Sequence, residues 1–135
     1  MEPVPQPLLQ PSATLREVGR AFIKHGNEFF FVSSDGQTLE GVVTTTDLLR
    51  AKSRGATAQT SQRDFMTPNP VAVALNDNCA VAASAIRECR LKSLPVVEHE
   101  HGRKLAGCVR LRRLVAFVFA EPDRPPEVEA VGQHR

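Results

Sequence analysis

The chain has 135 residues, of which 41% are apolar and 24% charged, and its formal net charge is +2 at pH 7. This length is enough for one ordinary hydrophobic core, and the net charge is too small to imply by itself a surface that binds nucleic acid or a membrane. No run of about eighteen apolar residues is present, so we expect a cytoplasmic protein without membrane insertion. The three cysteines lack the Cys-x-x-Cys spacing of zinc and redox motifs, as expected for small apolar residues in a reducing compartment.

The N-terminal segment predicts an extended lead-in followed by a helix. Residues 1–7 are rich in proline, which disfavours a helix, and should be extended. Thr14-Leu15-Arg16-Glu17 has the spacing of a capping box, which marks the start of a helix. Val18 and Phe22 then fall on one helical face, and Gly26 is placed to end the helix.

A hairpin and a second helix are predicted next. Two apolar runs, 28–33 and 39–43, flank an Asp35-Gly36 turn, which is the pattern of two antiparallel strands. The second helix should begin at Thr45 or Thr46. Small, polar and charged residues dominate 52–63, which predicts a linker.

The second half of the chain predicts the same order of elements. A short strand is expected at 71–74, and Asn78 should cap the helix that follows. This helix is expected to carry four residues inward: Ala82, Ala83, Ile86 and Cys89. A second hairpin is predicted from strands at 94–98 and 105–109, and a final helix from about Leu111 to Ala120.

The two halves are copies of one pattern, which fixes the architecture more firmly than any single motif. The matching segments are 29–32 (FFFV) with 94–97 (LPVV), and 39–48 (LEGVVTTTDL) with 105–114 (LAGCVRLRRL). The second copy keeps the frame but has Arg110 in place of Thr44 and Arg113 in place of Asp47. One copy therefore has an acid where the other has a cation.

The residues from Thr44 to Asp47 allow two interpretations. A strand that ends at Val43 and a helix that starts near Thr45 direct unpaired backbone N–H groups at whatever lies above them, which suits a phosphate. Thr44 adds a hydroxyl, and the two oxygens of Asp47 could accept both hydroxyls of a ribose. However, Thr and Asp are also favoured at helix starts because they cap free N–H groups.

Three motifs together resemble a known family. A Met66-Thr67-x-Asn69-Pro70-Val71 opening, a Leu94-Pro95-Val96-Val97 strand and a Gly41-x-Val43-Thr44-x-x-Asp47 turn are similar to those of a cystathionine-β-synthase (CBS) domain pair, or Bateman module. The resemblance covers roughly residues 8–119. It implies an α/β (α+β) fold of two pseudo-symmetric β-α-β-β-α repeats packed through their sheets. The expected divisions are a lead-in at 1–7, repeats at 8–51 and 64–120 joined by the linker at 52–63, and a disordered tail at 121–135.

The resemblance implies a regulatory module that is not an enzyme and needs no cofactor. Its expected ligands are adenosine-containing molecules such as AMP, ADP, ATP or S-adenosylmethionine, bound in the cleft between the repeats. Its expected protein partners are a second copy, forming a homodimer, and an unidentified regulated protein or fused domain. A dimerisation module with a vestigial pocket is the alternative, and a nucleotide hydrolase would need a base or metal beside the phosphate that the sequence does not show.

The resemblance also implies which residues line the intact cleft. These residues are Val42, Thr44, Thr45, Asp47, Pro70, Val71, Ala72, Lys92, Ser93 and Pro95. Lys92 is either a phosphate partner or a solvated lysine between helix and strand. In the other cleft Arg113 has no acceptor for ribose hydroxyls, so it and Arg110 would bind a bare phosphate, pair with Glu28 or simply be solvated. Phe30, aligned with Pro95, should partly fill that second cleft.

Overall fold

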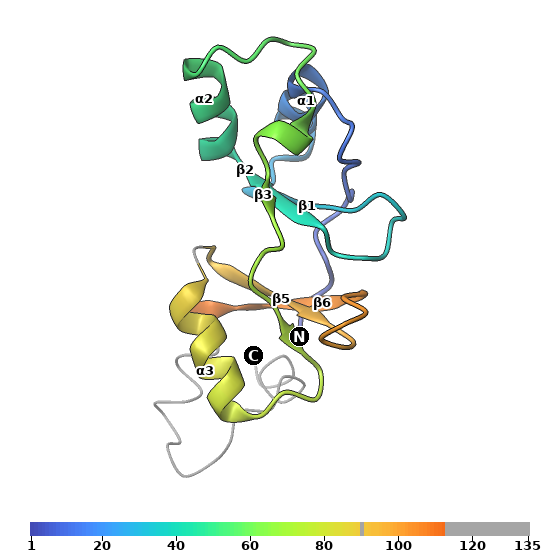
Figure 1. The fold of residues 1–135 in the computed structure, drawn as a ribbon, viewed down its shortest axis with the longest axis vertical. Helices are drawn as coiled ribbons and strands as arrows, with labels where there is room; N and C mark the ends of the chain where they lie inside the picture. Colours follow the sequence, from blue (N-terminus) through green and yellow to red (C-terminus); the bar gives the residue numbers. More distant parts are fainter. Residues whose placement is uncertain (90, 113–135) are drawn as a thin grey trace. The chain divides into compact units, whose positions relative to one another are not determined.

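The computed structural model describes residues 1–89 and 91–112, which form two compact units (Figure 1). The N-terminal unit is Pro5–Pro70, and the C-terminal unit combines Met1–Val4 with the described residues from Val71 onward. Each unit contains helix and a three-stranded sheet, so the mixed α+β class predicted from the sequence is confirmed. No helix within the described ranges is both long and apolar enough to cross a bilayer.

The N-terminal unit has an antiparallel sheet in the order β1-β2-β3. Its elements are α1 (Leu15–His25), β1 (Phe29–Val32), β2 (Gly41–Thr44), α2 (Thr45–Ser53), the 3₁₀ helix η1 (Gln62–Asp64) and β3 (Thr67–Pro68). Its core joins both helices to the sheet, and the rings of Phe22 and Phe30 meet edge to face at 4.7 Å.

The C-terminal unit has its sheet in the order β4-β5-β6, with β4 parallel and β6 antiparallel to β5. Its elements are β4 (Val73–Ala74), α3 (Cys79–Glu88), β5 (Ser93–Val97) and β6 (Leu105–Arg110). The core consists of Val73, Ala85, Leu94, Val96 and Val109. The helix predicted from Leu111 to Ala120 and the tail predicted at 121–135 lie, from residue 113 on, outside the described residues.

Local signals place the helix starts as predicted. The Thr14 hydroxyl accepts the N–H of Glu17 at 3.2 Å, and the Glu17 carboxylate accepts the N–H of Thr14 at 2.9 Å, which is a complete capping box. Gly26 ends α1 with φ of 65°, a left-handed conformation that glycine adopts without steric cost. Asn78 caps α3 by accepting the N–H of Val81.

The inward face of α3 differs by one position from the prediction. Ala82, Ile86 and Cys89 pack against the core as expected, but Ala83 is exposed and Ala85 is buried. Positions 82, 85, 86 and 89 follow the i, i+3, i+4, i+7 spacing of one helical face, whereas 83 lies outside it. The prediction for Ala83 was therefore wrong.

In each sheet, one strand of the hairpin pairs with a segment that does not belong to that hairpin. In the N-terminal unit β3 pairs antiparallel with β2, so that Thr67 lies opposite Val42. In the C-terminal unit Glu2 forms the equivalent bridge to Cys108, with N–H to O distances of 2.8 and 2.9 Å. The compact units thus divide the chain at 70/71, whereas the sequence repeats were divided at 63/64.

These edge contacts explain one glycine in each copy. A Cβ atom at Gly41 would lie 2.7 Å from the sulfur of Met66, and a Cβ at Gly107 would lie 2.7 Å from the backbone oxygen of Glu2. Only a residue without a side chain allows so close an approach. Gly107 is in addition covered by the side chain of Met1, as Gly41 is by Met66.

The strand registers also correct the alignment of the two copies. Phe31 lies opposite Val42 in the first sheet, and Pro95 lies opposite Cys108 in the second. Since Val42 and Cys108 are equivalent in the repeat, Phe31 and not Phe30 corresponds to Pro95. The error arose because the two short apolar runs were matched by composition, one residue out of register.

Candidate functional site

The turn between β2 and α2 is built by a second capping box. Thr44 is the N-cap, and its hydroxyl accepts the N–H of Asp47 at 3.2 Å. In return, one carboxylate oxygen of Asp47 accepts the N–H of Thr44 at 2.9 Å. The capping interpretation of these residues is therefore realised in the structure.

Asp47 differs from its counterpart in α1 by being buried. The two boxes have the same hydrogen-bond lengths, yet Glu17 is exposed whereas Asp47 is only 7% exposed. The second carboxylate oxygen of Asp47 faces the guanidinium of Arg50, one turn along α2, at 3.4 Å. A carboxylate has about four lone-pair positions, so these two contacts leave acceptor capacity on both oxygens.

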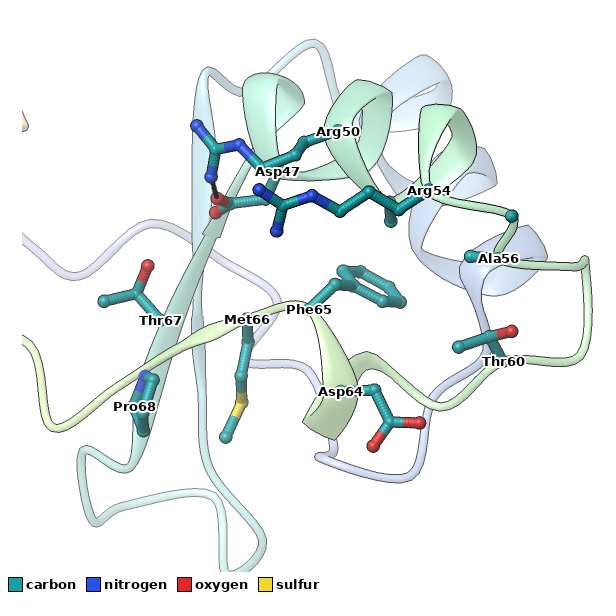
Figure 2. A pocket seen from close by; sticks show the side chains of 12 residues that line it. Asp47, Arg50, Arg54, Ala56, Thr60, Asp64, Phe65, Met66, Thr67 and Pro68 are labelled. Carbon is teal, nitrogen blue, oxygen red and sulfur yellow. Dashed lines mark hydrogen bonds and ion pairs between the residues drawn. The ribbon is translucent and has the colours of Figure 1, made fainter.

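Asp47 lines a pocket of about 510 Å³ within the N-terminal unit (Figure 2). From α2 and its C-cap the lining includes Asp47, Arg50 and Arg54, and from the segment that faces α2 it includes Asp64, Phe65 and Thr67. Asp47, Arg50 and the C-cap residue Arg54 are spaced i, i+3 and i+7, which places them on one helical face. The volume is within the range of small-molecule sites, about 300–1,000 Å³.

The predicted ligand-binding residues fall in both units. Val42, Thr44, Thr45 and Asp47 lie together on β2 and the first turn of α2, where Val42 is buried and Thr45 exposed. Pro70 is buried at the end of the N-terminal unit. The remaining residues belong to the C-terminal unit: Val71 and Ala72 before β4, Lys92 before β5, and Ser93 and Pro95 in β5.

Sequence reasoning missed the basic and aromatic parts of the pocket. Arg54 and Phe65 line it, but Arg54 fell in the segment taken for a linker, and Phe65 was not considered as a ligand contact. The helical spacing of Arg50 and Arg54 from Asp47 was the signal that could have identified them.

The equivalent turn of the second copy has another arrangement. Arg110, at the position of Thr44, pairs with the carboxylate of Glu2 at 3.2 Å, a partner that the sequence did not suggest. Arg113 lies outside the described residues. In the part of the chain that the structure describes, no three His, Cys, Asp or Glu side chains gather as metal ligands would.

Comparison with known proteins identifies the repeat. The family model of the CBS domain matches residues 3–54 and 63–120. The chain belongs to the CBS-domain family. No curated protein sequence matches this CBS-domain chain at a significant level.

Solved structures of CBS-domain proteins share its fold. PAE2072 from Pyrobaculum aerophilum, complexed with AMP, is 22% identical, with 90% of this chain and 95% of that chain covered and a TM-score of 0.66. CBSX2, a protein of Arabidopsis thaliana, in complex with AMP is 25% identical, with 87% and 90% covered and a TM-score of 0.62. The CBS domain pair of MJ0100, in complex with 5′-methylthioadenosine and S-adenosyl-L-methionine, is 17% identical, with 88% and 93% covered and a TM-score of 0.61.

Proposed function

We propose that this CBS-domain chain is a non-enzymatic regulatory module that binds an adenosine-containing ligand through Asp47. The observation that carries the proposal is a helix-capping aspartate that is buried and lines a pocket of ligand size. The AMP complexes of PAE2072 and CBSX2, and the S-adenosyl-L-methionine complex of MJ0100, support the ligand class.

The chemistry of the turn suits a ribose and a phosphate. Asp47 keeps acceptor positions for the two ribose hydroxyls, which donate hydrogen bonds. The Thr44 hydroxyl accepts from Asp47 and keeps its own hydrogen to donate. The N-terminus of α2 adds the positive end of the helix dipole, which favours an anion.

The proposal extends to the second repeat. Pro70, Val71 and Ala72 would line an adenine slot, with Lys92, Ser93 and Pro95 nearby. A ligand held by both repeats would favour one arrangement of the two units, and a regulated partner that prefers that arrangement would respond to it. The ligand would then act as a signal, with no chemistry performed on it.

Calorimetric titration with AMP, ADP, ATP and S-adenosylmethionine tests the proposal, and the second capping box provides a matched control. Asp47→Ala and Glu17→Ala each remove the N3 carboxylate of a capping box, so both should lose helix-start stability. Only Asp47→Ala should weaken ligand binding, by about 10- to 150-fold, because only it removes charge-assisted bonds of roughly 1.5–3 kcal/mol. Equal affinities of wild type and Asp47→Ala, or equal losses in both variants, would refute the role of Asp47.

A second candidate is a homodimerisation module with a vestigial pocket. It is favoured by two large apolar side chains left in solvent, Ile23 of α1 at 86% exposure and Leu49 of α2 at 72%. Exposed apolar side chains that gather into one contiguous patch are typical of surfaces that meet a second protein. Flat titrations with all four ligands, together with a dimer in light scattering, would favour this candidate over the first.

A further inference from the structure

Arg50 of α2 and Arg54, the residue that caps the C-terminus of α2, line the same pocket as Asp47. They are four residues apart and therefore neighbours on one face of the helix. Helical side chains lean toward the helix N-terminus, and in Figure 2 the Arg54 guanidinium reaches back along α2 toward Asp47. Both cations are thus presented near the carboxylate that we propose to bind the ribose.

The charges around this carboxylate are not balanced. Arg50 faces Asp47 at 3.4 Å, but none of the described residues forms an ion pair or a hydrogen bond with the guanidinium of Arg54. The other carboxylate of the lining is Asp64, and in Figure 2 its side chain lies beyond the Phe65 ring and points away from Arg54. One positive charge therefore remains without a partner on this side of the pocket.

Helix capping alone does not account for this arrangement. A cation is favourable at the C-terminal end of a helix, but Arg50 and Lys52 already supply two in the last turn of α2, so Arg54 is not needed for this purpose. Like charges four residues apart on a helix repel each other, so the pair of arginines is unfavourable unless an anion joins them. A phosphate is the natural anion, because the donors of a guanidinium match its oxygens in pairs.

The geometry points to a phosphate subsite formed by Arg54 together with Arg50, which selects phosphorylated adenosyl ligands over those that carry a sulfonium. This inference rests on the proposed function for the adenosyl part of the ligand. It adds that the ligand is negatively charged. A nucleotide phosphate is attracted to the two guanidinium groups. The sulfonium of S-adenosylmethionine is a cation and is repelled by them, while adenosine and 5′-methylthioadenosine gain nothing from them.

Four probes in calorimetric titration test the subsite: AMP, adenosine, S-adenosylmethionine and inorganic pyrophosphate. Arg54→Gln should weaken AMP and pyrophosphate by about tenfold, since Arg54 is exposed and its charge-assisted bonds are partly screened. Adenosine binding should change less than twofold, and S-adenosylmethionine should bind more tightly to the variant. Lys52→Gln, which removes an exposed cation from the same turn without touching the pocket, should leave all four affinities unchanged.

The outcomes separate this inference from the proposed function. If pyrophosphate binds in an Arg54-dependent manner but no adenosyl compound binds, the subsite stands and the proposed function fails. If adenosine and S-adenosylmethionine bind as tightly as AMP and Arg54→Gln changes none of them, the subsite is refuted while the proposed function stands. Equal weakening of AMP and adenosine by Arg54→Gln, or an effect of Lys52→Gln as large as that of Arg54→Gln, would also overturn the subsite.

Discussion

Replacing Gly107 by alanine should detach the first residues of the chain from β6. The new Cβ would lie 2.7 Å from the backbone oxygen of Glu2, and a backbone atom cannot move aside without carrying its strand with it. The bridge between Glu2 and Cys108 would then be lost, together with the contact between Met1 and Gly107.

The cost follows from the contacts of this bridge. Two backbone hydrogen bonds join Glu2 and Cys108, and each contributes about 0.5–1.5 kcal/mol. The exposed ion pair between Arg110 and Glu2 adds about 0–1 kcal/mol. Replacing glycine by alanine also lowers the conformational entropy of the unfolded chain, and this effect stabilises the folded protein by about 0.4–1 kcal/mol. From the centres of these ranges we expect Gly107→Ala to lower the free energy of unfolding by about 2 kcal/mol.

Urea unfolding of four proteins measures this cost and its cause. They are the wild type, Gly107→Ala, a chain without residues 1–4, and that shorter chain carrying Gly107→Ala. In the shorter chain the alanine meets no backbone and should be neutral or slightly stabilising, so the double-mutant cycle should give a coupling equal to or slightly larger than the loss in the full chain. A Gly107→Ala loss of the same size in both backgrounds would refute the steric reasoning.

Two further predictions concern titrating groups. Burial, and then the charge of Glu2, raise the pKa of the Cys108 thiol to about 11. Iodoacetamide at pH 8 should therefore label Cys108 far more slowly in the wild type than in the chain without residues 1–4. Equal labelling rates, measured by mass spectrometry, would contradict this prediction. The pKa of Asp35 is held below its usual value by hydrogen bonds from the backbone N–H groups of Thr38 and Gln37 and from the hydroxyls of Thr38 and Ser33. A lowered folded-state pKa gives stability that is present above about pH 4 and lost as the pH falls below it. In urea unfolding between pH 7 and pH 3, the free energy of unfolding of Asp35→Asn should therefore fall less with decreasing pH than that of the wild type. The same pH dependence in both proteins would contradict this prediction.

The elements that the sequence predicted well are those with local signals. The box of Thr14 and Glu17 and the cap at Asn78 depend on residues three positions apart, and both are found in the structure. The Asp35-Gly36 turn is local too, with Gly36 at a positive φ of 77°. These features depend on hydrogen bonds between residues close together in the sequence, so the local sequence is enough to predict them.

Features that depend on distant contacts could not be predicted. The bridge from Glu2 to Cys108 joins opposite ends of the described chain, and its residues carry no pairing signal of their own. The sequence predicts Gln62 in a polar linker, yet it is fully buried, and its amide nitrogen donates to the backbone oxygen of Gln10 while its amide oxygen has no partner among the described residues. Polar residues are buried where a partner exists, and the sequence does not show that partner.

The candidate site was predicted only in part. Asp47 lines the pocket, as a ligand-contacting residue should, but its burial and its contact with Arg50 come from the fold. The role of Asp47 and of the other proposed contact residues stays a prediction until ligand binding is measured.

The edge pairings of the two sheets, β3 with β2 and Glu2 with Cys108, affect how fragments of the chain should behave. A gene cut between the two copies, after residue 63, would give an N-terminal piece without Thr67–Pro68 and a C-terminal piece without Met1–Val4. Each piece would expose a bare row of backbone donors and acceptors on β2 or β6, and such rows recruit strands from other molecules. Aggregation of such a truncated product would thus indicate that its edge strand is missing. The two copies should therefore be expressed together in one chain.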